Sequence, residues 1–411
     1  MAKPNLALIP AAQGTKFYSV LPSDGVGDFD FTRASAATRV NKDGLIETVA
    51  SGQSRLNYPL IDGVVNGCPS HLLEPSRQNV LWYSQDFTNA YWINNGVTVN
   101  ADQAISPDGT LNADLLTGVS GGFGVVRFST WSATNNVASC FAKKASSSTF
   151  IIKNASGGVG GVTFDLDNGT IISVSTGFEG EIENYGNGWY RCIAKDRDGR
   201  SGTFSLGVNG AGESIYMWGS QLEQTHKTSY IPTTNSSVTR VAEIANGAGD
   251  ASTFNDSEGV LYIESKAFVD TIALNRKIVL GDGTFNNGVE FSYQTTTNKM
   301  QFIVRSGGVI SMIIETTSYD VTEFNKIAIS YKLNEGKVFV DGFQLGSTDT
   351  SVVTPIGINT LSFDFASSFD FEGSVKDVRV YNTVLTDSGL ETLTSWVSFS
   401  DMAEGQLYTI Q

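Results

Sequence analysis

The sequence is poor in the residues on which metal binding and acid–base catalysis most often depend. Of its 411 residues, only 2 are histidine and 3 are cysteine. No recognisable serine or cysteine nucleophile motif surrounds His71 or His226, so no catalytic triad is predicted. Cys68, Cys140 and Cys192 are odd in number and lack C-x-x-C spacing, which argues against a disulfide framework and against a zinc site. We interpret the cysteines as small apolar residues on strands.

Positive charge and long apolar runs are also scarce. Lys and Arg number 27 against 42 Asp and Glu, giving a net charge of -15. This acidity repels phosphate backbones and anionic membranes, and no basic cluster offsets it, so we expect no nucleic-acid partner. The apolar runs are strand-sized, and MAKPNLALIPAA at the start is too short and too proline-interrupted for a signal peptide. We therefore expect a soluble protein made in a cytoplasm, without membrane insertion.

What is present favours strands. The chain has 43 Gly but only 9 Pro, and 17% of its residues are charged, a composition typical of short strands joined by tight turns. Asn168 and Gly169 separate two apolar stretches. An Asn-Gly pair in this position is the strongest short-range signal for a β-hairpin. Ile327 and Ile329 alternate with other residues before a second turn, which predicts a hairpin with a buried face. Only residues 386–393 look helical, and only for a turn or two. The fold class is predicted to be all-β.

The length predicts more than one domain, because single hydrophobic cores stop growing below this size. Residues 1–80 are irregular and are interpreted as an extended N-terminal arm, whose short apolar pieces pack against the next domain or a neighbouring copy. Residues 81–245 contain enough strands for a jelly roll. Residues 243–259 are small and polar and are interpreted as a linker or boundary loop. Residues 246–411 then form a second β-sandwich.

Two resemblances are carried by specific segments. FTRASAATRVNKDGLIE, CPSHLLEPSRQNVLWYSQDFTNAYW and MWGSQLEQTHKTSYIPTTNSSVTRVA, within residues 1–245, resemble a module of tail-fibre-like and other virion proteins of tailed phages. The middle of this region is similar to jelly-roll carbohydrate-binding modules. FNKIAISYKLNEGKVFVDGFQLGS and FEGSVKDVRVYNTVLTDSGLETL, within residues 259–397, resemble the laminin-G-like, or concanavalin-like, sandwich.

These resemblances imply a virion protein that is assembled in the host cytoplasm and attaches to host cell-surface glycans. They also imply contacts with other virion proteins and a homo-oligomer, since trimers are common among such fibres. Two alternatives stay open: a virion-bound polysaccharide depolymerase, and a purely structural decoration or adaptor protein.

Aromatic side chains are the main chemical resource for binding sugars, because sugar rings stack on them while polar side chains bond the hydroxyls. Packing in the core is the alternative for each aromatic residue, since aromatics usually serve burial. The candidate carbohydrate-binding residues are Tyr91 and Trp92 in QDFTNAYW, Trp131 in a polar, loop-like context, and Tyr293 and Arg305 in the C-terminal sandwich.

Calcium is the only cofactor expected, because sandwich modules of these kinds commonly hold a structural calcium ion through carboxylates and loop carbonyls. Asp108, Asp114 and Asp341 are the candidate ligands. The alternative is that they are solvated aspartates in turns.

Catalysis is not predicted. Glu179, Glu181 and Glu183 alternate in FEGEIENYG, and glucanases with a concanavalin-like fold carry alternating carboxylates on one strand. Here the glutamates lie outside the concanavalin-like region, and Glu181 stands where the catalytic pattern would have Asp. We interpret them as the polar outer face of a strand, with no catalytic residue, and predict that the protein is not an enzyme.

Overall fold

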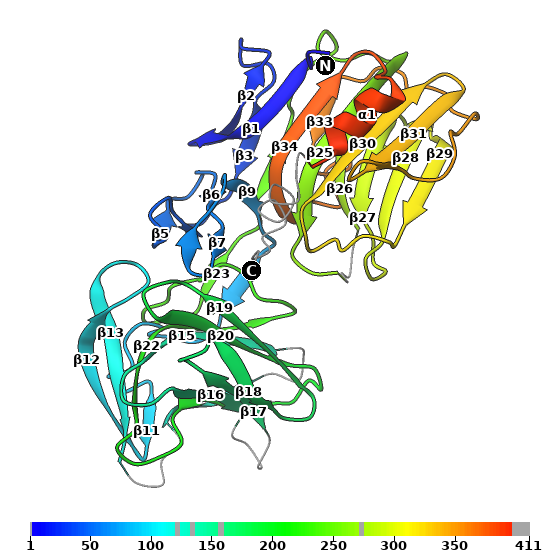
Figure 1. Ribbon diagram of the computed structural model, residues 1–411. Helices are drawn as coiled ribbons and strands as arrows, with labels where there is room; N and C mark the ends of the chain where they lie inside the picture. Colours follow the sequence, from blue (N-terminus) through cyan, green and yellow to red (C-terminus); the bar gives the residue numbers. More distant parts are fainter. Residues whose placement is uncertain (1, 120–123, 132–135, 155–159, 271–274, 397–411) are drawn as a thin grey trace.

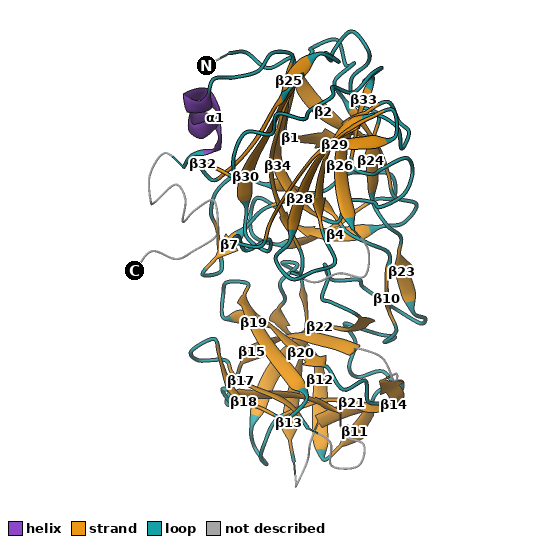
Figure 2. Cartoon of the chain, turned by 90° about the vertical axis from the view of Figure 1, so that its right-hand side faces the viewer, coloured by secondary structure: helices purple, strands orange, loops and turns teal. Residues whose placement is uncertain are grey.

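The structure is a computed structural model that describes residues 2–119, 124–131, 136–154, 160–270 and 275–396. These residues form 34 strands and one short helix, which confirms the all-β prediction. The strands gather into two bodies, joined by a waist of shorter strands (Figures 1 and 2). In the described part of the chain, no helix has the length and apolar character needed to cross a membrane.

The C-terminal sandwich consists of a large sheet facing a five-stranded sheet. The order along the large sheet is β24-β3-β2-β1-β34-β25-β30-β31-β32, with β9 also pairing with β34 and β6 with β9. Its strands are β24 (Ile244–Asn246), β3 (Phe29–Thr32), β2 (Lys16–Leu21), β1 (Leu6–Gln13), β34 (Gly373–Tyr381), β25 (Glu258–Ala267), β30 (Asn325–Lys332), β31 (Glu335–Val340), β32 (Phe343–Gln344), β9 (Ser70–Leu73) and β6 (Leu56–Asn57). The facing sheet contains β29 (Val309–Thr316), β28 (Met300–Ser306), β27 (Gly288–Tyr293), β26 (Arg276–Gly281) and β33 (Thr360–Ser362).

The first strands of the chain belong to this sandwich, so the prediction of an N-terminal arm packed on the next domain or on another copy is wrong for them. β1 runs antiparallel to β34 and places Leu6 opposite Val380. Leu6, Leu8 and Phe17 lie in the same hydrophobic core as Val380. Short apolar segments need a sheet edge to satisfy their backbone hydrogen bonds, and here that edge is supplied by a strand near the other end of the sequence.

The predicted hairpin and helix of the C-terminal sandwich are both confirmed. β30 and β31 pair around a turn at Asn334, whose φ of 59° suits a tight hairpin. Ile327 and Ile329 face the core. Ala328, on the opposite face of β30, is buried together with Leu390 of the helix α1 (Asp387–Thr394). The large sheet is therefore covered on both faces at this point.

The jelly roll is built from two six-stranded sheets. One sheet contains β11 (Ile93–Asn95), β14 (Gly124–Trp131), β21 (Gly202–Gly207), β16 (Thr149–Asn154), β17 (Gly161–Asp165) and β18 (Thr170–Val174). The other contains β12 (Val97–Ile105), β13 (Leu111–Gly118), β22 (Ser214–Gln224), β15 (Asn136–Lys144), β20 (Trp189–Asp196) and β19 (Phe178–Asn184). The predicted turn at Gly169 joins β17 to β18. Cys140 and Cys192 are buried opposite each other on β15 and β20, as interpreted, whereas Cys68 is exposed and lies outside the strands.

The jelly roll is inserted into the rest of the chain through one pair of strands. The chain enters it after β10 (Arg77–Asn79) and leaves it before β23 (Val238–Arg240), and these two strands are antiparallel neighbours. Of the two alternatives for residues 243–259, the linker is wrong, because Glu243 is 2% exposed and Phe254 lies in the C-terminal core; residues 247–257 form a loop between β24 and β25. The waist also contains the small pairs β4 (Ala37–Val40) with β5 (Ile46–Val49) and β7 (Leu60–Ile61) with β8 (Val64–Val65).

Candidate functional site

An aromatic stack, formed by Trp82 on Tyr91, lies in the loop between β10 and β11. Trp82 is 42% exposed, and its ring stacks on that of Tyr91 with centroids 5.6 Å apart and 15° between the planes. Below it, Trp92 meets Tyr91 edge-on at 5.3 Å and is 4% exposed. Trp92 belongs to the core of the jelly roll. The aromatic stack thus connects that core to the solvent.

The backbone beside Trp82 is held in place by hydrogen bonds. Tyr83 has a φ of 50°, which is uncommon for a bulky residue and persists only where surrounding contacts enforce it. Its N–H donates to the carbonyl of Thr234 at 2.5 Å, and its carbonyl accepts from Nε1 of Trp92 at 3.1 Å. The next residue, Ser84, shares a 2.6 Å hydrogen bond with the hydroxyl of Tyr230. The exposed ring is therefore carried on a fixed support.

The other predicted sugar-binding residues whose side chains the structure describes are buried or largely covered. Trp92 is a core residue, and so is Tyr293, which is 2% exposed and therefore inaccessible to a ligand in solvent. Arg305 is bonded through Nε to Glu290 at 2.8 Å, and its side chain is only 16% exposed. Trp131 ends β14, but its side chain lies outside the described residues. Among the predicted residues whose side chains the structure describes, only Tyr91 takes part in an exposed aromatic group.

Trp82 is the residue that the sequence prediction leaves out. It follows Leu81, which is fully buried, and this step from a buried to an exposed side chain is a weak signal in a segment rich in aromatics. Sequence alone does not distinguish which of the neighbouring rings points outward.

The three aspartates expected to hold calcium do not share a site. Asp108 closes its own turn by accepting from the hydroxyls of Ser106 and Thr110, each at 2.7 Å. Asp114 accepts two backbone N–H groups, and burial raises its pKa to about 6. Asp341 lies in the other sandwich, where burial also raises its pKa to about 6. Within the described ranges, no three His, Cys, Asp or Glu side chains are grouped as metal ligands. The three aspartates are therefore not grouped in one place, and calcium binding by any one of them, together with loop carbonyls, stays a prediction.

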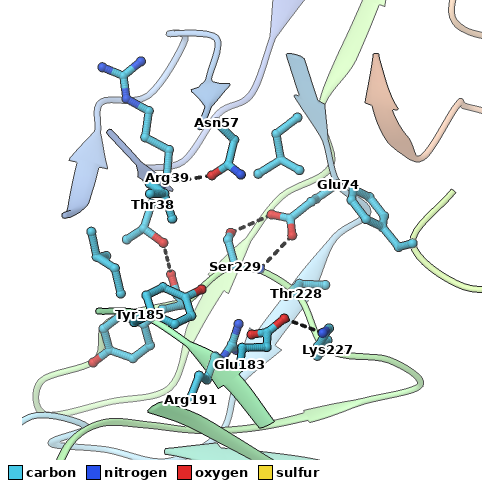
Figure 3. Close-up of a pocket in the computed structure, with 15 residues that line it drawn as sticks. Thr38, Arg39, Asn57, Glu74, Glu183, Tyr185, Arg191, Lys227, Thr228 and Ser229 are labelled. Carbon is cyan, nitrogen blue, oxygen red and sulfur yellow. Dashed lines mark hydrogen bonds and ion pairs between the residues drawn. The ribbon is translucent and has the colours of Figure 1, made fainter. Parts of the chain in front are cut away.

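A junction cleft lies where the jelly roll meets the waist and the C-terminal sandwich. It is made of three adjoining cavities of about 150, 540 and 920 Å³, and both Asn57 and Glu183 line all three. Figure 3 shows the smallest cavity, where an ion pair joins Glu183 to Lys227 and Tyr185 lies nearby. Burial raises the pKa of the Tyr185 hydroxyl to about 12, so it stays protonated. Ligand sites commonly form at such domain junctions.

The alternating glutamates of β19 face this cleft. Glu179 is exposed, as interpreted, but Glu181 and Glu183 are about one third exposed and share Lys227 as an ion-pair partner, so the expectation of an exposed strand face is wrong for these two. Burial opposes ionisation of Glu181, but attraction to Lys227 and Lys195 outweighs it and lowers its pKa to about 2. A carboxyl that stays ionised at neutral pH is a poor general acid for glycoside cleavage.

Beside the cleft, five buried charged side chains form a junction ion cluster: Arg33, Arg55, Glu74, Arg240 and Glu243. Glu243 binds Arg33 at 2.6 Å and Nε of Arg55 at 2.8 Å. Glu74 binds Arg55 and Arg240, each at 2.8 Å. Each side chain is at most 3% exposed. Burial opposes ionisation of Glu74, but the two arginines hold its pKa well below the usual range.

The fold and these sites define an all-β protein of two joined sandwiches, with an exposed aromatic stack on one and a polar cleft between them. Residues 266–390 match the family described as the concanavalin A-like lectin/glucanases superfamily. This match lies within the C-terminal sandwich. No curated protein matches the chain.

Solved structures give weak similarities. The CBM40 module of the Ruminococcus gnavus IT-sialidase, bound to α2,3-sialyllactose, is 17% identical with a TM-score of 0.31, over 36% of this chain and 94% of that one. Domain 4 of an arabinanase from Geobacillus stearothermophilus is 14% identical with a TM-score of 0.30, over 42% and 83%. Trypanosoma rangeli sialidase is 10% identical with a TM-score of 0.31, over 96% and 69%. Similarities at these scores carry no functional conclusion.

Proposed function

We propose that this protein is a non-enzymatic glycan-binding protein of a tailed-phage virion that attaches the particle to host cell-surface glycans. The observation that carries the proposal is the aromatic stack, because Trp82 offers an exposed ring on a fixed support. The C–H face of a sugar ring packs on such a surface, and a support that is already ordered reduces the entropy lost on binding.

Two further observations support the proposal. Residues 266–390 match the concanavalin A-like lectin/glucanases superfamily, whose description names both lectins and glucanases and so supports a carbohydrate ligand. The segments of residues 1–245 that resemble phage virion modules support the virion location, contacts with other virion proteins, and assembly into a homotrimer. Several copies would strengthen attachment, since linked weak sites reach a much higher overall affinity.

The binding function is favoured over glycan cleavage by the charge state of β19. Glu181 and Glu183 both contact Lys227, and the low pKa of Glu181 keeps this carboxyl ionised at neutral pH, so Glu181 does not supply the proton that cleavage requires.

The test is a glycan array probed with the native protein and with two variants. We expect Trp82→Ala to weaken binding roughly tenfold, equivalent to about 1.4 kcal/mol. Phe343→Ala is the matched control, because Phe343 is a 71% exposed ring on the other sandwich and its loss should leave binding unchanged. An array without hits would contradict glycan binding and favour the adaptor alternative. Release of oligosaccharides from host polysaccharide would contradict the non-enzymatic part of the proposal.

A further inference from the structure

The largest cavity of the junction cleft has two walls from different domains. On the jelly-roll side lie the glutamates of β19 together with Lys195, Arg197 and Lys227. On the side of the C-terminal sandwich lie Lys266, near the end of β25, and Phe268 just after it. Its volume of about 920 Å³ is in the range of small-molecule sites.

The cations of the jelly-roll wall are all neutralised. Lys195 binds Glu181 at 2.9 Å, and Arg197 binds Glu179 at 2.6 Å. Lys227 contacts both Glu181 and Glu183. These side chains already have the counter-charges that they need.

Lys266 differs from them. Among the described residues, no carboxylate lies within ion-pair distance of its ammonium group, which stands 5.2 Å from the centre of the Phe324 ring. Burial, and repulsion by Lys227 and Lys376, lower the pKa of Lys266, while Glu323 and Glu183 are attractive but too distant to pair with it. A partly buried ammonium without a counter-ion is costly, and the cost falls when an anion arrives.

We propose that the junction cleft binds a carboxylate-bearing sugar residue whose carboxylate pairs with Lys266. The inference rests on the proposed glycan binding and names the class of glycan. The half-buried ring of Phe268 gives the sugar an apolar surface, and Asn57 and Thr322 line the same cavity with groups that bond hydroxyls. The glutamates of the opposite wall stay bound to their own lysine and arginine partners and accept hydrogen bonds from the sugar hydroxyls.

The experiment compares two sugars that differ only in the carboxylate, methyl glucuronide and methyl glucoside, by calorimetric or NMR titration of the full-length protein. We expect at least a tenfold preference for the glucuronide. N-acetylneuraminic acid and galactose 6-sulfate distinguish a general carboxylate site, which binds the first, from a site for any anion, which binds both.

Lys266→Met removes the charge but keeps most of the side-chain length, and it should bring the two affinities within about twofold. Lys332→Met is the control, because Lys332 is an exposed lysine of the same sandwich outside the cleft, and it should keep the preference. Thermal unfolding tests whether both variants are folded. If Lys266→Met is unfolded, Lys266→Arg replaces it in the test: this variant keeps the positive charge and should keep the preference for the glucuronide. Equal binding of the two sugars by the native protein, or an unchanged preference in Lys266→Met, overturns this inference. Neither result contradicts the proposed binding of glycans at the aromatic stack. If the native protein binds no glycan at all, the proposed function is overturned as well.

Discussion

At the scale of single residues, the junction ion cluster holds the waist together. It joins Arg33, Arg55 and Glu74, which precede the jelly roll, to Arg240 and Glu243, which follow it. The segments that enter and leave the jelly roll are therefore held together at one point. Three cations face two anions, and each guanidinium also donates to backbone carbonyls or neighbouring hydroxyls. Such a network is stable only while every charge keeps its partner.

We expect Glu243→Gln to destabilise the protein by about 3 to 5 kcal/mol, because it removes the carboxylate partner of the buried Arg33 and leaves Glu74 as the one carboxylate facing the three arginines of the cluster. Denaturant unfolding of the native protein and the variant measures the difference. Glu335→Gln serves as the control, because Glu335 is 43% exposed in its pair with Lys337, and such pairs are worth about 0 to 1 kcal/mol. If Glu243→Gln lowers the free energy of unfolding no more than the control does, the cluster rearranges around the lost charge without a loss of stability.

The sequence reveals little of these residue-scale features. Alternation identifies which side of a strand is apolar, but Arg33 and Glu243 are separated by more than 200 positions and have no local pattern that would pair them. The same holds for Lys227 and the glutamates of β19, which look exposed in the sequence because Lys227 lies beyond the next three strands. Buried ion pairs between distant segments depend on the tertiary fold, and period-2 patterns do not encode it.

At the scale of elements, local patterns succeed and long-range pairing fails. The turn at Gly169, the hairpin around Asn334 and the helix α1 are each determined by neighbouring residues, and each is confirmed. β1 pairs with β34 although the two strands lie far apart in the sequence, and neither strand carries a signal that identifies its partner. An isolated short strand therefore looks like an arm in the sequence, although it lies inside a sheet.

We expect Phe17→Ala to destabilise the C-terminal sandwich by about 3 to 5 kcal/mol, because Phe17 on β2 is fully buried in its core. Its ring stacks on Phe31 at 5.2 Å and on His71 at 3.9 Å, so truncation leaves a cavity between strands of the N-terminal segment. Tyr18→Ala is the matched control, because the next residue of the same strand points the other way and is 41% exposed. Chemical denaturation compares the two variants. If both variants lower the free energy of unfolding by the same small amount, the first strands contribute little to the stability of the C-terminal sandwich.

At the scale of the whole molecule, the jelly roll is an insertion in a sandwich that is built from the segments before and after it. The jelly roll has a core of its own, and the C-terminal sandwich has another. The aromatic stack belongs to the first and Lys266 to the second, while the junction cleft needs both. A site between domains depends on their relative position, which the waist and the junction ion cluster maintain.

The insertion can be removed at its base. Asn79 of β10 and Val238 of β23 lie directly opposite each other, so a two-residue Asn-Gly turn can replace residues 80–237 and close the two strands as a hairpin. We expect the shortened chain to keep a folded C-terminal sandwich with one cooperative unfolding transition, because the core of that sandwich contains no residue of the jelly roll. The transition should shift to lower temperature, since Glu74 loses the hydrogen bonds that it accepts from Ser229. Circular dichroism and calorimetry measure both effects, with the full-length protein as reference.

Residues 80–237 expressed alone should fold and retain the glycan binding that depends on Trp82. A shortened chain that binds hydrophobic dyes and unfolds without a cooperative transition would mean that the two sandwiches fold only as one unit.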